Sequence, residues 1–485
     1  MRHRCTRRAW STRPGRTLGC LAATALLASG CARYEPAPIV PEQSLEDFEA
    51  RTLDSPELRQ YLAGVGLDTA AAALGDGWDL HALTLAAFFY SPALDVARAQ
   101  WGVARGGVIT AGGVANPAVI GGVGYNSTTS PDVITPWIYD AALDIPIDIA
   151  GKRGIRIAQA RQLSESARLD VLSAAWDVRS RVRGAFLELY VARAGDSLLT
   201  ARQEHRAEIV RILERQLEVG EVSPYEVSRA RIALADGRVA VLEGRRRRAR
   251  ARSALADAVG VPPAALDTVT LSLVDVGAVA PAPPEREIRI RALVNRSDIL
   301  AALAEYEASQ EALRLEIRKQ YPDFSLGPAY QLDQTDSKWT LGVSFSLPIF
   351  NRNKGPIAEA EAKREEMAAR FLALQSRVLA DLEAAIAGAR TAAEQVRAAD
   401  ELLGSLRQQE GAAETQYRVG QISKLELLTL REETASAALA RLDALAGAQA
   451  AVGALEDAMQ SPLDVGEWVL ERPSRQSGEE AAHDD

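Results

Sequence analysis

The sequence is poor in the residues that carry most enzyme chemistry. It has three cysteines and four histidines among 485 residues, and His81, His205 and His483 lie far apart in different contexts. It contains no phosphate-binding glycine loop, zinc-ligand spacing or nucleophile elbow. We therefore expect no catalytic residue and no metal site, and the protein is not expected to be an enzyme.

Long apolar runs are missing as well. The stretch from Leu18 to Leu27 is too short for a helix that crosses a bilayer, which takes about 20 apolar residues. It belongs to a segment, residues 1–30, that holds six arginines and no acidic residue. A basic start followed by a short apolar stretch and small residues indicates a secretory signal at 1–30.

The few cysteines exclude a disulfide framework. Cys5 and Cys20 lie inside the predicted signal, so a processed chain would keep Cys31 alone. The segment Leu27-Ala28-Ser29-Gly30-Cys31 resembles the bacterial lipobox, in which the cysteine becomes the lipidated first residue. The alternative is an ordinary signal peptide that contains a cysteine. The covalent lipid at Cys31 is the only non-protein group that we expect, and Ala32 after it favours the outer over the inner membrane.

The chain has fewer basic than acidic residues, 56 Lys and Arg against 65 Asp and Glu. The formal net charge is −9, and removal of the six arginines of the predicted signal brings it to −15. Nucleic-acid binding depends on neutralising phosphates with Lys and Arg, so we expect no nucleic-acid partner. The basic cluster between Arg245 and Arg252 is spread around a helix by steps of about 100°. We interpret it as a solvated or interface-lining stretch.

The sequence does contain a long repeat. The segment Val219-Gly220-Glu221-Val222-Ser223-Pro224-Tyr225-Glu226 returns as Val419-Gly420-Gln421-Ile422-Ser423-Lys424-Leu425-Glu426. In each copy the glycine suits the left-handed position that ends a helix. The serine, with a glutamate three residues later, forms the capping-box pattern that starts the next helix. One unit used twice is therefore expected.

Each unit is predicted to contain a very long helix. No proline lies between Pro146 and Pro224 or between Pro356 and Pro462. A continuous helix from Ile155 to Val219 would be about 98 Å long. Apolar residues recur at steps of three and four, which is typical of a coiled-coil seam. The predicted seams are Val171, Ala175, Val178, Val182, Ala185 and Leu189 in the first unit, and Met367, Phe371, Leu374, Val378, Leu382 and Ala385 in the second.

Two strands are predicted before each long helix, at 117–126 and 137–147 and at 323–331 and 339–350. Their length and alternation are typical of tilted barrel strands in a membrane, although a soluble sandwich would show the same alternation. Four strands cannot close a barrel, so several chains would have to share one. A membrane aromatic belt is predicted from Tyr125, Trp137, Tyr139, Tyr330, Trp339, Phe345 and Phe350.

The expected organisation follows from these segments. It comprises a signal peptide at 1–30, a lipidated lead-in and collar segment at 31–80, a first repeat at 81–267 with its tip near 220, a Pro-rich connector at 268–286, a second repeat at 287–463 with its tip near 420, and a disordered tail at 464–485.

Together, these features resemble the TolC-type outer-membrane efflux proteins over nearly the whole mature chain. Tyr90-Ser91-Pro92-Ala93-Leu94 is similar to the family's Asn-Pro-x-Leu signature, with Ser91 in place of Asn. Ile149-Ala150-Gly151-Lys152-Arg153 is similar to the Gly-Lys-Arg segment of the cobalt–zinc–cadmium branch. The second repeat departs from that segment with Asn351-Arg352-Asn353-Lys354-Gly355.

The resemblance implies a mainly α fold with a membrane β-barrel portion. Three chains would form a 12-stranded barrel in the outer membrane, continued by a periplasmic α-helical barrel. The protein would be a passive exit duct for small molecules or metal ions, coupled to a periplasmic adaptor and an inner-membrane pump. The adaptor would contact the two tips, at Val219, Gly220, Ser223, Val419, Gly420 and Ser423.

Three alternatives stay open at this point. Glu221, Glu226 and Glu426 are candidates for an acidic gate ring, because closely spaced acids favour cations, although capping or solubility is the favoured role of each one taken singly. The duct of a type I polypeptide secretion system would have the same fold. A periplasmic coiled-coil adaptor lipoprotein would share the signal and a helical hairpin, but it usually has one hairpin.

Overall fold

The computed structural model describes residues 34–65, 77–127, 135–272 and 285–462. The predicted signal, Cys31, the tail at 464–485 and most of the predicted connector lie outside the described residues. The chain divides into two compact units, Met1–Ala50 and Arg51–Asp485. The first contains helix α2 (Pro41–Glu49), which has a proline in its first turn and no buried residue.

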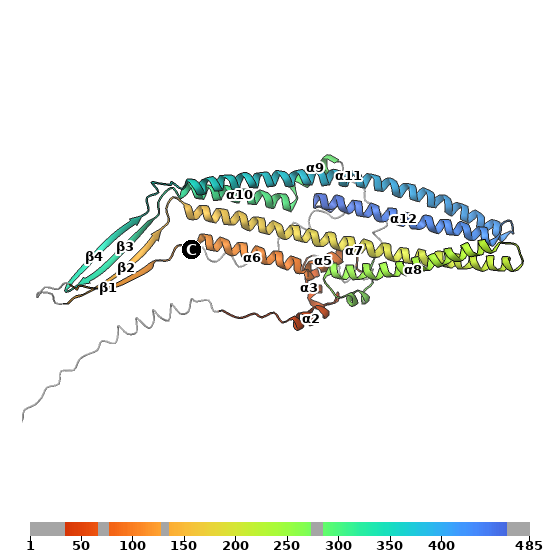
Figure 1. Cartoon of the computed structure of the whole chain (residues 1–485), viewed down its shortest axis with the longest axis horizontal. Coiled ribbons are helices and arrows are strands. Elements are labelled where there is room, and N and C mark those ends of the chain that lie inside the picture. Colours follow the sequence, from red (N-terminus) through yellow and green to blue (C-terminus); the bar gives the residue numbers. More distant parts are fainter. Residues whose placement is uncertain (1–33, 66–76, 128–134, 273–284, 463–485) are drawn as a thin grey trace, which may run out of the picture. The chain divides into compact units, whose positions relative to one another are not determined.

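The second unit contains the repeat. Its elements are α3 (Pro56–Gly64), α5 (Leu80–Tyr90), α6 (Pro92–Gly112), β1 (Ala118–Tyr125), β2 (Trp137–Ile147), α7 (Lys152–Glu218), α8 (Pro224–Val259), the 3₁₀ helix η2 (Pro263–Asp267), α9 (Glu285–Val294), α10 (Ser297–Arg318), β3 (Phe324–Asp333), β4 (Asp336–Phe345), α11 (Lys354–Arg418) and α12 (Lys424–Met459). The order helix, two strands, long helix and return helix occurs twice (Figure 1). The described chain is thus mostly helical with one small sheet.

The strands of both repeats form a single antiparallel sheet in the order β1-β2-β3-β4. The join between repeats is the β2–β3 pair, whose register runs from Ile138 opposite Asp333 to Ile147 opposite Phe324. β1 pairs only with β2 and β4 only with β3. Each outer strand therefore leaves one edge unpaired within the described part of the chain.

The prediction for the last strand was wrong in its bounds. β4 spans Asp336–Phe345 and not 339–350. It begins earlier because the turn uses only two residues, Gln334 and Thr335, with Gln334 at a φ of 59°. It ends earlier because its partner β3 begins at Phe324, which lies opposite Phe345, and Pro348 further on has no N–H to donate to a ladder. Phe350 consequently lies outside the sheet and is 97% exposed.

The two long helices were predicted correctly, and α7 and α11 contain 67 and 65 residues. Positions 200 residues apart are buried in both: Val178 matches Val378, and Val182 matches Leu382. The remaining seam residues are buried or partly buried. α7 is the central helix of the unit, because it packs against α5, α6, α8, α10 and α12. α11 packs against α9, α10 and α12.

Two apolar clusters hold these helices together. The first joins α3 and α5 to α7 and α8, with Leu58, Leu83, Val182 and Leu255 fully buried. The second joins α9 and α10 to α11 and α12 around Leu382. No single helix among the described residues is long and apolar enough to cross a membrane, although α5 and α6, bent by 51°, pass that test as a pair.

Candidate functional site: the hairpin tips and the ties between the repeats

Both hairpin tips end their long helix in the same way. The amide of Gly220 donates to the carbonyl of Leu217 at 3.1 Å, and the amide of Glu221 donates to that of Gln216 at 2.9 Å. This is the Schellman motif, which needs a left-handed residue. Gly220 has a φ of 78° and Gly420 one of 77°, as predicted. A Cβ atom added at either glycine would meet nothing within 4 Å, so glycine is required here for its backbone conformation.

Both tips also contain the predicted capping box. The carboxylate of Glu226 accepts from the amide of Ser223 at 2.8 Å, while Ser223 Oγ accepts from the amide of Glu226 at 3.3 Å. In the second tip the matching distances between Ser423 and Glu426 are 2.8 and 3.2 Å. The backbone hydrogen bond, followed by the serine hydroxyl, lowers the pKa of both glutamates.

The capping boxes bear on the predicted acidic ring. The carboxylates of Glu226 and Glu426 are turned back onto their own helix starts. The Glu221 carboxylate has no hydrogen bond or ion pair to any described residue, and the side chain is exposed.

The valines beside the turn are open to solvent as well, since Val219 is 71% and Val419 66% exposed. The tips therefore present small apolar surfaces.

Six of the seven predicted aromatic residues fall into two groups on the sheet, and Phe350 lies beyond the end of β4. Tyr125 faces Trp137 across β1 and β2 with ring centroids 5.0 Å apart, and Tyr330 faces Trp339 across β3 and β4 at 4.8 Å. These pairs, with Tyr139, lie towards the hairpin-turn end. Phe345 lies at the opposite end of β4, where it packs against Phe324 at 5.6 Å. The sequence analysis placed Phe324 in the predicted strand at 323–331 but not in the aromatic belt, since its position opposite Phe345 depends on the register of two strands.

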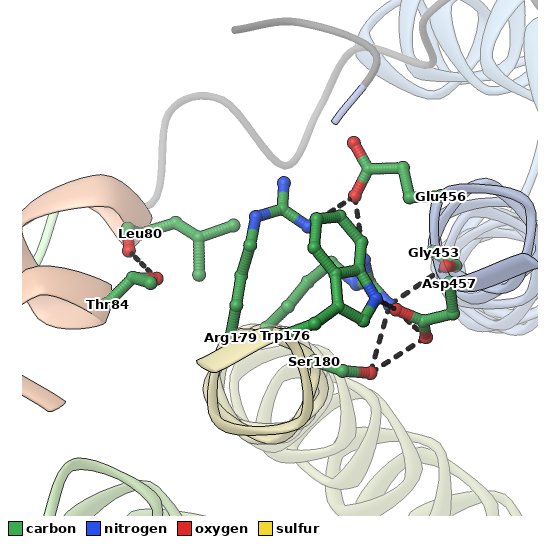
Figure 2. A network of polar contacts seen from close by, with 9 residues as sticks. Leu80, Thr84, Trp176, Arg179, Ser180, Gly453, Glu456 and Asp457 are labelled. Carbon is green, nitrogen blue, oxygen red and sulfur yellow. Dashed lines mark hydrogen bonds and ion pairs between the residues drawn. The ribbon is translucent and has the colours of Figure 1, made fainter. Parts of the chain in front are cut away.

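A network of charged residues ties α12 to α7 and was not predicted (Figure 2). Glu456 accepts from Arg179 at 2.8 Å and from Arg183 at 2.7 Å. Asp457 accepts from Arg183 at 2.6 Å and from the indole of Trp176 at 2.9 Å. Glu456 is only 4% exposed, so its carboxylate is largely removed from water, whereas the side chain of Asp457 is 35% exposed. Its partners lie more than 270 residues apart, and nothing in the local pattern connects them.

A second tie lies closer to the tips. The Glu432 carboxylate accepts from Arg202 at 2.8 Å and from Arg206 at 2.6 Å, again between α12 and α7. Lys424, the first residue of α12, donates to Glu208 of α7 at 2.6 Å. The second hairpin is thus bound along much of α7 by ion pairs.

The turns from sheet to long helix are anchored on one shared segment, residues 316–323. Lys152 is 4% exposed, and its Nζ donates to the carbonyl of Tyr321 at 2.6 Å and to Asp323 at 2.8 Å. In the second repeat the side-chain amide of Asn353 donates to the carbonyl of Glu316 at 2.8 Å. The Gly-Lys-Arg segment singled out in the sequence therefore contributes a buried lysine to this junction.

No group of three or more His, Cys, Asp or Glu in the described ranges is arranged to hold a metal ion. The exposed tips have the features of a contact surface, and the ion pairs and the buried lysine have those of a supporting frame.

One curated relative is the cobalt-zinc-cadmium resistance protein CzcC of Cupriavidus metallidurans. It is 27% identical over 245 residues, which are 49% of this chain and 58% of that protein. The match thus spans less than two thirds of the relative's own length.

Solved structures share the fold over more of the chain. The outer membrane protein VceC of Vibrio cholerae has a TM-score of 0.63 and 20% identity, covering 79% of this chain and 96% of its own. The open state of the MtrE outer membrane channel of Neisseria gonorrhoeae has a TM-score of 0.63 and 16% identity, covering 79% and 89%. The outer membrane efflux protein model matches residues 87–261 and 289–459, one stretch in each predicted repeat. This chain therefore belongs to the outer membrane efflux protein family.

Proposed function

We propose that the protein is the outer-membrane exit duct of a tripartite efflux system. Three copies would place their sheets side by side, and the 12 strands would close a barrel that continues into a tube of helices. The observation that carries this proposal is the four-stranded sheet, whose β1 and β4 each leave one edge unpaired among the residues that the structure describes. Every residue of β4 is exposed, and open strand edges are not tolerated in lipid. A barrel closed between copies would pair the free edge of β1 in one copy with the free edge of β4 in the next.

The proposal includes an anchor and two partners. A lipid on Cys31 would hold the chain to the outer membrane, and the exposed tips would receive a periplasmic adaptor linked to an inner-membrane pump. The test is fractionation followed by detergent extraction and native mass spectrometry. We expect a lipidated trimer from the outer membrane. A single-chain species that is released into the aqueous fraction would refute the proposal.

Metal ions are the proposed cargo class. The support is the likeness to CzcC, a cobalt-zinc-cadmium resistance protein, together with the Gly151-Lys152-Arg153 segment. A deletion strain should become sensitive to zinc, cobalt or cadmium and regain resistance when the gene is restored. Unchanged metal resistance with new sensitivity to dyes would assign the duct to another pump. Loss of a secreted polypeptide would instead favour the type I secretion alternative.

We further propose that Glu221 contributes an acidic ring at the tips of the trimer. It is the one of the three candidate acids whose carboxylate is not held in a capping box. Glu221→Gln should reduce the preference for cations over anions in planar bilayers. Glu226→Gln is the matched control, since its carboxylate caps a helix. Equal cation preference in wild type and Glu221→Gln would end this idea.

A further inference from the structure

The two segments that lead from the sheet into the long helices share one backbone, at an offset of 202 residues. They are here called the first turn (residues 148–156) and the second turn (residues 350–358). The amide of the first residue of each long helix donates to the carbonyl three residues earlier, at 3.5 Å in the first turn and 3.0 Å in the second. Each turn has two successive residues with positive φ, Ala150 and Gly151 in the first and Arg352 and Asn353 in the second. The side chains of the two turns can therefore be compared position by position.

The first turn uses its charges inside the protein. Asp148 accepts from the guanidinium of Arg156 at 2.6 Å. Lys152 is 4% exposed and donates to Asp323 at 2.8 Å. The guanidinium of Arg153 donates to the last carbonyl of α6 at 2.7 Å. Each of the three cations of this turn thus has a partner within the chain.

The second turn carries a different set of side chains. Phe350 stands at the position of Asp148 and is 97% exposed. Arg352 and Lys354 are both exposed, and the second turn contains no acidic residue. Neither cation forms an ion pair with any residue that the structure describes. Arg352 has a φ of 47°, an uncommon conformation for a long side chain, so the turn keeps an arginine where the first turn has an alanine.

A third cation lies beside the second turn. The side-chain amide of Asn353 donates to the carbonyl of Glu316 at 2.8 Å and to its carboxylate at 3.0 Å, which fixes the turn on the end of α10. Arg318 lies in the last turn of α10 and is exposed, with no ion pair in the described ranges. The Glu316 carboxylate also accepts from Lys319 at 2.6 Å. The acid close to these cations is therefore already engaged.

The residues around Phe350 are suited to a membrane boundary. Leu347 and Ile349 are each 60% exposed and continue the apolar alternation of β4 past the end of the strand. The second turn lies between β4 and α11, where the sheet gives way to helices (Figure 1). In the proposed duct this is the level at which the barrel leaves the lipid on the periplasmic side. Aromatic rings are enriched at that level, and cations just beyond it attract anionic lipids.

We propose that Arg318, Arg352 and Lys354 form a site for the head group of an anionic phospholipid of the inner leaflet, with Phe350 inserted among the acyl chains beside it. This inference rests on the proposed function, because it requires the sheet to be in the outer membrane. The lipid phosphate accepts hydrogen bonds from the guanidinium groups, whose planar fork matches its oxygens, and Lys354 adds a point charge. The first turn thus braces the sheet on the protein, whereas the second fixes it to the lipid.

The test is native mass spectrometry of the full-length trimer titrated with phosphatidylglycerol or phosphatidylcholine. The wild type should bind phosphatidylglycerol more tightly. Arg352→Gln with Lys354→Gln should weaken that binding by about fivefold for each cation removed and leave phosphatidylcholine binding unchanged. The matched control is Arg153→Gln with Arg156→Gln, which removes the same charge from the first turn and should leave the affinity for phosphatidylglycerol unchanged.

A second measurement tests the position of Phe350. A nitroxide label on Phe350→Cys, in vesicles of phosphatidylglycerol, should collide more often with dissolved oxygen, which partitions into lipid, than with a water-soluble nickel chelate. The same label on Tyr225→Cys at the first tip, where the tyrosine is 69% exposed, should show the reverse order. The labelled wild type gives the background from Cys31.

Four outcomes would overturn the inference and leave the duct intact. The trimer could bind both lipids equally, or the control variant could lose as much affinity as Arg352→Gln with Lys354→Gln. Displacement of phosphatidylglycerol by excess inorganic phosphate would assign the cations to a free anion. A label at position 350 that neither oxygen nor the nickel chelate reaches would mean that a second copy covers the turn. A single-chain species in wild type and every variant would instead refute the proposed function.

Discussion

The α7–α8 hairpin and the α11–α12 hairpin close their tips with the same hydrogen bonds, yet their surroundings differ. In the first, α7 is covered by helices on several sides, whereas much of α11 opposite its seam is exposed. In the second, the return helix is tied to α7 by one buried and one partly buried ion pair, whereas the return helix of the first repeat keeps the matching face open. Duplication preserved the turn chemistry, and the two copies diverged in the residues that join one hairpin to the next.

The largest loss of stability is expected at Glu456, because this buried residue joins the second hairpin to α7. Glu456→Gln removes the acceptor charge shared by Arg179 and Arg183, whose side chains are each 16% exposed. Breaking a buried pair by removing one partner costs about 3–5 kcal/mol. The midpoint of urea unfolding, followed by helix circular dichroism, should fall accordingly.

The control lies on the same helix. Glu433 is exposed, and Glu433→Gln should change stability by no more than about 0.5 kcal/mol. Equal midpoints for the two variants would mean that α12 is not held on α7 by this network. The comparison between a tied and an untied hairpin would then fail.

The turns and the long helices could be predicted from the sequence because they depend on the preferences of neighbouring residues. Gly220 and Ser223 specify a turn through their own backbone preferences, and the absence of proline permits the long helices. The network around Glu456 was not accessible, because its arginines are contributed by another repeat. The end of β4 was misjudged for a similar reason: alternation continues to Leu347, but pairing with β3 stops at Phe345.

An intermediate loss of stability is expected at the turn from β2 to α7, where Lys152 is buried. Lys152→Met leaves the carbonyl of Tyr321 without this donor and Asp323 without its cation. An unsatisfied buried polar group costs about 1–3 kcal/mol. Because the amide of Ile149 donates to the same Asp323, hydrogen exchange at Ile149 should also become faster.

The matched variant in the second repeat is Lys354→Met. Lys354 is likewise the first residue of its long helix, but its side chain is exposed. The Lys354→Met variant should keep the free energy of unfolding and the rate of amide hydrogen exchange near their wild-type values. If both lysines proved equally sensitive, the two junctions would not differ as their contacts indicate.

The smallest effects are expected at the tips, where the two hairpins should respond alike. Ser223→Ala and Ser423→Ala each remove an N-cap, which costs about 1 kcal/mol of helix stability. Hydrogen exchange of the amides of Glu226 and Glu426 should accelerate to a similar extent. A large difference between the tips would show that their environments, and not their shared turn chemistry, control them.

Acid should loosen both tips together. The hydrogen bonds from the serine amides hold the pKa of Glu226 and Glu426 below its ordinary value of 4.5. Each carboxylate therefore stabilises its tip fully above that value, and the contribution is lost as the pH falls through the lowered pKa. Exchange at Ser223 and Ser423 should rise in that acidic range, and Glu226→Gln should remove the pH dependence at the first tip only. Persistence of the acid response at Ser223 in that variant would assign it to another group.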